Sequence, residues 1–240
     1  MIDHYLWGSC TRISPEAPVQ IIDVERETFL LGGAGNVANN LLALGAQVWV
    51  ASVIGDDADG ELLCQLLKEA GANDSMLIKS TGRKTSRKTR LMAAHQQVVR
   101  YDKETKTPIT SSEEEHLLAY ILPTLPQFEI VLLSDYGKGV LTEKVCQTII
   151  HTCRAHQIKV LVDPKGTNYS KYKGAYLITP NRKEAAAATG LSLTTDEQLL
   201  RAGLQLKQSL ELTYAVITLS EAGMAYFDDQ MHVIPTQARD

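Results

Sequence analysis

Apolar runs that read as strands alternate with helical patterns along most of the chain. The run Val48–Val53 precedes a helical pattern over Asp59–Ala70, and Ile130–Ser134 precedes one over Thr142–His156. The later predicted elements are strands over Lys159–Val162, Ala175–Ile178, Tyr214–Leu219, Met224–Phe227 and His232–Ile234, and helices over Lys183–Thr189 and Asp196–Leu210. Buried strands separated by helices are typical of a parallel sheet that helices cover on both faces. We therefore expect an α/β fold with a mostly parallel central sheet.

Two segments depart from this alternation. Pro18–Leu31 and Lys84–Tyr101 are strand-like and polar at alternate positions, and no helix follows them promptly. This pattern suits a small, half-exposed antiparallel sheet. We expect a β lid, formed by about residues 12–31 and 83–102, beside the main sheet. The exposed edges of such a lid favour a homodimer.

A glycine cluster, Gly32-Gly33-Ala34-Gly35, precedes an apolar helical run that Asn36 opens and Gly45 ends. Glycines let a polar ligand approach the backbone, and a helix N terminus presents free N–H groups. A tight strand-to-helix turn would explain the same glycines without any ligand. The cluster does not follow G-x-G-x-x-G, and the chain contains neither a P-loop nor a G-x-S-x-G motif.

Polar segments follow four of the predicted strands. They are Ser134–Gly139, Asp163–Gly166, Thr179–Glu184 and Thr218–Gly223. In open α/β sheets, ligands bind beyond the carboxyl ends of the strands. Any one segment alone is explained by a turn or a helix cap, because aspartate and asparagine suit both. The four together indicate a binding site at one edge of the sheet.

Composition narrows the classes of function. The chain has 240 residues, enough for one large α/β domain, and its net charge of −4 attracts neither nucleic acid nor an anionic membrane. No apolar run is long enough to span a membrane, and no signal peptide opens the chain. The four cysteines lack metal-binding spacing, and the six histidines form no HExxH motif. We expect a cytoplasmic protein that acts on a small molecule.

Several strings give the chain an end-to-end resemblance to the ribokinase-like (PfkB) carbohydrate kinases. They are Arg12–Val19 (RISPEAPV), Gly32–Ala38 (GGAGNVA), Leu133–Gly139 (LSDYGKG), Asp163–Thr167 (DPKGT) and Pro235–Ala238 (PTQA). Within that family, the first and third strings are similar to those of the D-glycero-β-D-manno-heptose 7-phosphate kinases, which form half of bifunctional heptose kinase/adenylyltransferases. The resemblance implies one ribokinase-like kinase domain over residues 1–240, a three-layer α/β/α fold with a β lid.

The resemblance also implies an activity and its residues. The activity is ATP-dependent phosphorylation of heptose 7-phosphate at the anomeric C1 hydroxyl, which supplies a lipopolysaccharide core precursor. Residues implied to bind the sugar are Asp3, Gly32, Gly33, Asn36, Lys88 and Asp135. Residues implied to bind ATP are Asn181, Arg182, Lys183, Glu184, Ser220 and Gly223, and Glu184 would also position Mg²⁺ through water. Lys88 lies in the densest basic run, most of which a solvated strand face explains, and it is expected to reach the substrate phosphate.

Two motifs of the family do not occur in these 240 residues. The Gly-Ala-Gly-Asp motif, which carries the family's catalytic base, is expected just beyond Asp240, and a strand ending in Gly-Asp is expected before Met1. We therefore expect a domain that is incomplete at both ends and nearly inactive. Two alternatives stay open at this stage. One is another PfkB sugar kinase of the ribokinase or fructokinase type, and the other is a non-catalytic sugar- or nucleotide-binding fragment.

Overall fold

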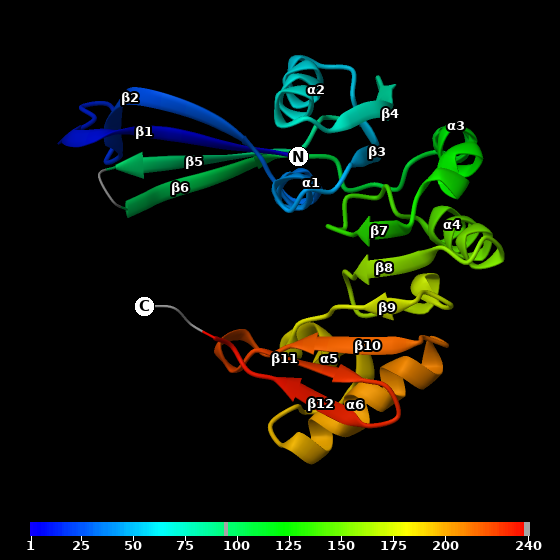
Figure 1. Cartoon of the computed structure of the whole chain (residues 1–240). Coiled ribbons are helices and arrows are strands. Elements are labelled where there is room, and N and C mark those ends of the chain that lie inside the picture. The colour runs from blue at the N-terminus through cyan, green and yellow to red at the C-terminus, as the bar shows by residue number, and fades with distance from the viewer. Residues whose placement is uncertain (94–95, 238–240) are drawn as a thin grey trace. The chain divides into compact units, whose positions relative to one another are not determined.

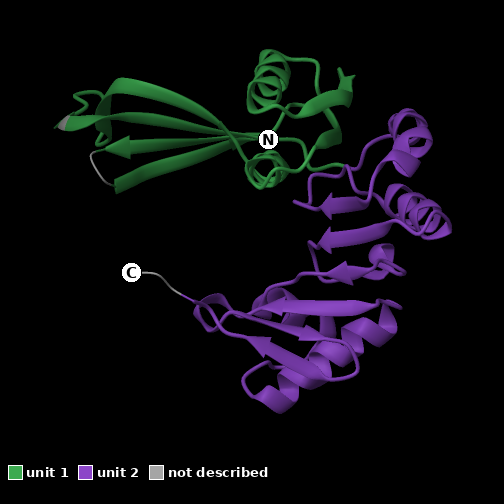
Figure 2. Cartoon of the chain, viewed as in Figure 1, with its two compact units in different colours: residues 1–107 green, residues 108–240 purple. Residues whose placement is uncertain are grey.

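The structure is a computed structural model that describes residues 1–93 and 96–237, so Ala238 and Asp240 of the sequence analysis lie outside the described residues. The chain divides into two compact units, Met1–Thr107 and Pro108–Asp240 (Figure 2). The single domain over residues 1–240 stays a prediction, and each unit is described by itself.

Unit 1 contains a four-stranded sheet, which we call the lid sheet (Figure 1). Its order is β2 (Gln20–Leu31), β1 (Ile2–Ile13), β5 (Arg87–Ala93) and β6 (Gln96–Lys103). β1 is antiparallel to β2 and parallel to β5, and β5 is antiparallel to β6. The expected β lid is thus confirmed. β1 was not predicted as a strand, and it adds a strand to the lid, which begins at Ile2 instead of at about residue 12.

The rest of unit 1 is a small α/β part. It comprises α1 (Ala34–Ala43), β3 (Trp49–Gly55), α2 (Ala58–Ala70) and β4 (Asn73–Ser80), with β3 and β4 paired in parallel. Ile2 at the start of β1 is fully buried in a core with Ile54 and Leu67. This burial fixes the first residues of the lid sheet against β3 and α2, because apolar side chains there avoid water.

Unit 2 is built on a six-stranded sheet with the order β12-β11-β10-β9-β8-β7. Its elements are α3 (Ser111–Ile121), η1 (Leu122–Gln127), β7 (Ile130–Ser134), α4 (Glu143–Ala155), β8 (Lys159–Asp163), η2 (Ser170–Tyr172), β9 (Leu177–Ile178), α5 (Arg182–Thr189), α6 (Asp196–Ser209), β10 (Tyr214–Thr218), η3 (Ser220–Ala222), β11 (Met224–Phe227) and β12 (Met231–Ile234). β7 to β10 are parallel, whereas β11 and β12 add antiparallel strands at one edge. The α/β class and the mostly parallel sheet are confirmed.

Helices cover this sheet because each has one apolar face. Val145, Cys146 and Ile149 of α4 are at most 2% exposed, and α4 packs on β8. α6 packs in the same way on β10 and β11. Since β7 to β10 run parallel, their carboxyl ends lie along one edge of the sheet, where the polar segments follow them.

Candidate active site

In unit 1, the carboxylate of Asp3 accepts a hydrogen bond on one oxygen and lies close to a glycine with the other. Arg90 of β5 donates a hydrogen bond from Nη1 to Asp3 Oδ1 at 2.7 Å, and its guanidinium lies over the ring of Tyr5. Asp3 Oδ2 lies against Gly32, where a Cβ atom would come within 2.4 Å of it. Only glycine leaves room for this carboxylate. Asp3 keeps 22% of its side chain exposed, so it is an oriented acceptor that a ligand hydroxyl can reach.

Helix α1 begins two residues after Gly32, the residue that lies against the Asp3 carboxylate. Its N-cap is Gly33, so the helix starts at Ala34, two residues earlier than the predicted start at Asn36. No acidic residue lies in the first turn, and the exposed Asn36 side chain makes no hydrogen bond to a described residue. The first turn therefore presents polar groups and the positive end of the helix dipole to a polar ligand.

Lys88 of β5 lies in register with Asp3 of β1 on one side and with Asp102 of β6 on the other. Both carboxylates are already paired with arginines, Asp3 with Arg90 and Asp102 with Arg100. Within the part of the chain that the structure describes, the half-buried Lys88 makes no hydrogen bond or ion pair. The structure thus brings Asp3, its glycine neighbour and a cation without a partner onto one face of the lid sheet.

In unit 2, the four polar segments meet at the carboxyl edge of the sheet, as the sequence predicted. Ser134 at the end of β7 is in register with Asp163 at the end of β8. Asn181, after β9, forms a parallel bridge with Thr218 at the end of β10. The parallel register of these strands is what brings residues far apart in sequence to one edge.

Asp135 follows β7 and is only 6% exposed. Its Oδ1 accepts a hydrogen bond from the Gly137 amide at 2.7 Å. Its Oδ2 accepts from Lys171 Nζ at 2.6 Å and from the Tyr172 hydroxyl at 2.7 Å. Lys171 also donates to the Leu141 carbonyl, at the other end of the same loop. Asp135 therefore organises the loop after β7, and sequence analysis missed Lys171 and Tyr172 because no motif marks them.

Glu184 lies in the first turn of α5, where it forms a capping box with Asn181. The Asn181 side chain accepts from the Glu184 amide at 2.9 Å, and the Glu184 carboxylate accepts from the Asn181 amide at 3.1 Å. Lys165 donates to Glu184 Oε1 at 2.9 Å. Burial, followed by the charge of Glu184, raises the pKa of the Asp163 carboxyl above its usual range. Asp163 is thus a second acid beside Glu184, and the sequence analysis gave it no role.

The two basic residues of α5 differ in their surroundings. Arg182 donates from Nη1 to the Leu193 carbonyl at 2.8 Å, so part of its guanidinium is bound to the loop between α5 and α6. Lys183 is exposed and has no hydrogen-bond or ion-pair partner among the described residues. Of the two, Lys183 is the cation more available to a ligand.

The turn after β10 holds Ser220 and Gly223 in unusual backbone conformations. Ser220 has φ 55° and Gly223 has φ 95°, which favours glycine. A Cβ at residue 223 would lie 2.0 Å from the Ile234 carbonyl oxygen. Gly223 is therefore required by the close passage of the chain after β12, whichever ligand the turn receives.

The carboxyl edge of unit 2 fits a hydrated magnesium ion better than a directly ligated one. No group of three or more His, Cys, Asp or Glu side chains in residues 1–93 and 96–237 is placed to hold a metal. Asp163 and Glu184 are nonetheless close enough to interact electrostatically. Mg²⁺ keeps several of its waters and uses one or two protein carboxylates together with phosphate oxygens. These two acids match that donor set, and Lys165 forms an ion pair with Glu184.

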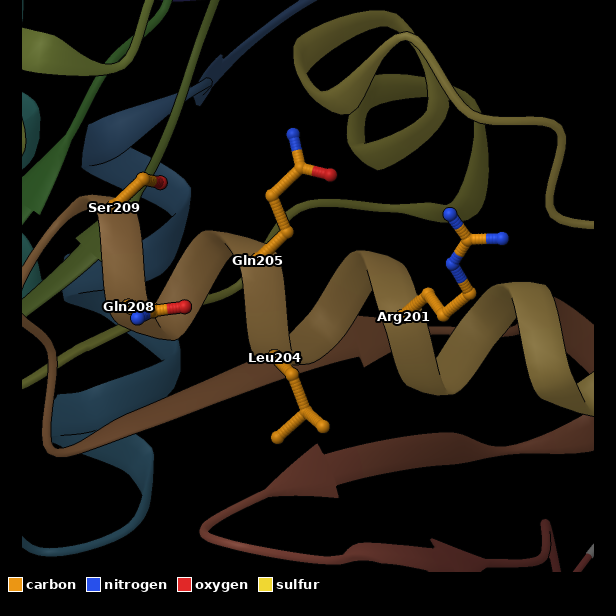
Figure 3. A pocket seen from close by; sticks show the side chains of 5 residues that line it. All are labelled: Arg201, Leu204, Gln205, Gln208 and Ser209. Atoms are coloured by element: carbon orange, nitrogen blue, oxygen red, sulfur yellow. The ribbon is translucent and has the colours of Figure 1, made fainter.

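A surface pocket elsewhere in unit 2 lies along α6 (Figure 3). Arg201, Leu204, Gln205, Gln208 and Ser209 line it, and none of them is a predicted site residue. Among the described residues, no helix combines the length and the apolar character that crossing a bilayer requires.

Comparisons with known proteins agree with this geometry. The sequence pattern of the pfkB family carbohydrate kinases matches residues 3–240. The "Bifunctional protein HldE" of Sulfurimonas denitrificans is 52% identical over 240 residues, which is all of this chain and 50% of that protein. The chain thus spans about half the length of the curated relatives it matches.

Solved structures share the fold at low sequence identity. Arabidopsis thaliana ribokinase, complexed with ribose and ATP, matches with a TM-score of 0.71 and 17% identity over 98% of this chain and 75% of that one. Phosphofructokinase-2 from Escherichia coli, in complex with fructose-6-phosphate, matches with a TM-score of 0.75 and 19% identity over 99% and 78% of the two chains. The family pattern over residues 3–240 and the half-identical relative together show that this chain belongs to the pfkB family of carbohydrate kinases.

Proposed function

We propose that the chain is a sugar-kinase domain that acts on D-glycero-β-D-manno-heptose 7-phosphate. The reaction transfers the γ-phosphoryl group of ATP to the anomeric C1 hydroxyl and gives heptose 1,7-bisphosphate. The observation that carries the proposal is the lid-sheet face, where an oriented carboxylate, Asp3, lies beside a lysine without a partner, Lys88. A hydroxyl acceptor and a free cation suit a sugar that bears a phosphate. The bifunctional relative, which this chain matches over half its length, supports the choice of heptose.

On the sugar side, Asp3 accepts hydrogen bonds from hydroxyl groups, and Gly32 and Gly33 let the ring approach the backbone. Asn36 donates or accepts at the start of α1, and Lys88 binds the substrate phosphate. Asp135 acts indirectly on the sugar site, by fixing the loop after β7, since three donors of the protein already occupy its two oxygens. These roles are those that the resemblance implies, and the contacts within each unit support them.

On the nucleotide side, we assign ATP to the carboxyl edge of the sheet in unit 2. The residues are Asn181, Arg182, Lys183, Glu184, Ser220 and Gly223, with Lys183 as the available cation. Glu184 and Asp163 would hold a Mg²⁺ ion there through water. Charge on the triphosphate is neutralised by this ion when it is bound, which favours in-line transfer.

In the transfer step, the C1 oxygen forms a bond to the γ-phosphorus while the bond to the bridging oxygen of ADP breaks. The C1 hydroxyl proton passes to a base, which the family places in a Gly-Ala-Gly-Asp motif that these 240 residues do not contain. A general base contributes about 10²–10⁴-fold to a rate. We therefore expect this chain to bind both substrates and to turn them over at a rate lower by about that factor.

The test is isothermal titration calorimetry of the 240-residue chain. Heptose 7-phosphate is titrated beside fructose 6-phosphate and ribose, and a non-hydrolysable ATP analogue is titrated with and without Mg²⁺. We expect heptose 7-phosphate to bind at least about tenfold more tightly than the other sugars, a difference of about 1.4 kcal/mol. Equal affinity for fructose 6-phosphate or ribose would point to another sugar kinase, and binding of no sugar would refute a sugar site.

ATP consumption by this chain, beside a version extended through the Gly-Ala-Gly-Asp motif, tests the missing base. Equal rates would show that a base lies within these 240 residues.

We also propose a homodimer formed through the lid sheet. Its edge strands β2 and β6 expose Val24, Leu30, Val99 and Tyr101, each between 46% and 51%. Unpaired strand edges with exposed apolar side chains are suited to pairing with another chain. Light scattering of the purified chain tests this, and a monomer at all concentrations would contradict it.

A further inference from the structure

Charged side chains form two neighbouring rows on one face of the lid sheet. Across β1, β5 and β6, the first row reads Asp3, Lys88 and Asp102, and the second reads Tyr5, Arg90 and Arg100. Cross-strand neighbours in one row have Cβ atoms about 5 Å apart, so opposite charges there attract one another. Lys88 lies between two aspartates, and the arrangement expected by default is an ion pair with one of them.

The structure shows a different pairing. Arg90 pairs diagonally with Asp3 at 2.7 Å. Arg100 pairs along its own strand with Asp102, through Nε to Oδ1 at 3.1 Å and Nη2 to Oδ2 at 3.3 Å. A planar guanidinium matches a carboxylate with two parallel hydrogen bonds, which an ammonium cannot do. Arg100 makes both of these bonds to Asp102, and Arg90 makes one short bond to Asp3, so each acid pairs with an arginine and not with Lys88.

We propose that Arg90 and Arg100 are positioning residues that determine specificity by keeping the Lys88 ammonium unpaired. Within these two rows, two aspartates, two arginines and one lysine leave one net positive charge, and it resides on Lys88, which has no partner among the described residues. The Lys88 ammonium is then free to bind the phosphate group of a phosphorylated sugar. The inference rests on the proposed function for the identity of the ligand, but the pairing itself can be tested without any sugar.

Arg100 gives the cleaner test, because Asp102 has no proposed contact with the sugar whereas Asp3 does. In Arg100→Gln, Asp102 loses this partner and is left opposite Lys88, the residue of β5 in register with it. Lys88 then pairs with Asp102 and is no longer free to bind an anion. The double variant Arg100→Gln with Asp102→Asn removes the competing acid and frees Lys88 again.

The matched control is Arg26→Gln. Arg26 lies on the same face of the sheet, over the ring of Trp7 at 5.0 Å, and it forms no ion pair with a described residue. This change removes one positive charge from the face without releasing an aspartate. It separates the pairing effect from a loss of general positive charge.

Two measurements are made on the 240-residue chain and its variants. The first is the rate at which an amine reagent labels Lys88, followed by mass spectrometry with no ligand present. The second is the calorimetric affinity for heptose 7-phosphate and for the unphosphorylated heptose. Because Lys88 would lose its charged hydrogen bond to the phosphate, we expect Arg100→Gln to lower the affinity for the phosphorylated sugar about tenfold, which is about 1.4 kcal/mol. Lys88 labelling also slows in this variant, whereas affinity for the unphosphorylated heptose stays unchanged.

The double variant should regain both the labelling rate and the affinity, and Arg26→Gln should resemble the wild type in both. Unchanged Lys88 labelling in Arg100→Gln would overturn the inference. A double variant as weak as Arg100→Gln would also overturn it, since Arg100 would then contact the phosphate itself. If labelling changes as expected but no variant binds heptose 7-phosphate, the pairing stands and the proposed substrate is wrong.

Discussion

Replacing Asp135 with alanine removes the acceptor that joins three parts of unit 2. The Gly137 amide, the Lys171 ammonium and the Tyr172 hydroxyl all donate to this one carboxylate. Tyr172 is fully buried, so its hydroxyl depends on Asp135 as its acceptor. The variant leaves the Tyr172 hydroxyl without its acceptor and leaves the Lys171 ammonium with the Leu141 carbonyl but no counter-charge.

The size of the effect follows from this burial. Breaking a buried ion pair by removing one partner costs about 3–5 kcal/mol, because the other charge stays uncompensated. Lys171 keeps 24% of its side chain exposed and can turn toward water, which places the loss near the lower end. We expect Asp135→Ala to lower the free energy of unfolding of unit 2 by about 3 kcal/mol, from a total of roughly 5–15 kcal/mol for a typical domain.

Hydrogen exchange measures this loss in unit 2, through peptides that cover β7, α4 and β8. The two tryptophans, Trp7 and Trp49, both lie in unit 1, so their fluorescence reports that unit separately. A second variant, Asp135→Ala with Lys171→Met, removes both charges and should recover part of the lost stability. A loss below about 1 kcal/mol in Asp135→Ala would refute the reasoning, because it would mean that the pair is already well solvated.

Three further predictions concern single residues. Gly32→Ala places a Cβ atom 2.4 Å from Asp3 Oδ2, and we expect it to weaken calorimetric binding of heptose 7-phosphate about tenfold, whereas Gly82→Ala, whose Cβ meets nothing closer than 3.6 Å, should not. Equal affinities of these two variants would contradict the role of that close contact. Lys88→Ala should weaken binding of the phosphorylated sugar more than that of the unphosphorylated one, and a similar loss for both would leave Lys88 without a phosphate role. Burial raises the pKa of the Cys146 thiol to about 12, so at pH 8 a thiol reagent should label it only after denaturation; rapid labelling of the native chain, read by mass spectrometry, would contradict its burial.

Much of unit 2 could be predicted from sequence because its strands are short apolar runs bounded by turn residues. β7 and β11 were predicted to the residue, and β8 and β10 to within one residue. The helix α3 was missed, although Thr110 and Glu113 form a capping box whose spacing is visible in the sequence. β1 was missed because its role as a strand depends on β2 and β5, which pair with it from outside its own segment.

The residues of the candidate site stay a prediction, and their contacts could not be predicted from sequence. Asp3 and Lys88 were named through the resemblance to the family, whereas the ion pair of Asp3 with Arg90 joins residues 87 positions apart. It depends on the parallel register of β1 and β5, which no local pattern encodes. The same holds for Lys171 and Tyr172, which reach Asp135 from a short helix that carries no recognisable motif. Polar contacts of this kind depend on the register of distant segments, so they become visible only in three dimensions.

The parallel pairing of β1 with β5 also has a consequence for how the protein folds. The antiparallel pair β1–β2 can form from the first 31 residues, because its strands are neighbours in the chain. The partner of Asp3, Arg90, lies in a strand that comes after α1, β3, α2 and β4. Closing such a long loop is entropically costly, and contacts between distant segments form slowly. During synthesis, the carboxylate of Asp3 therefore acquires its orientation only after most of unit 1 has left the ribosome.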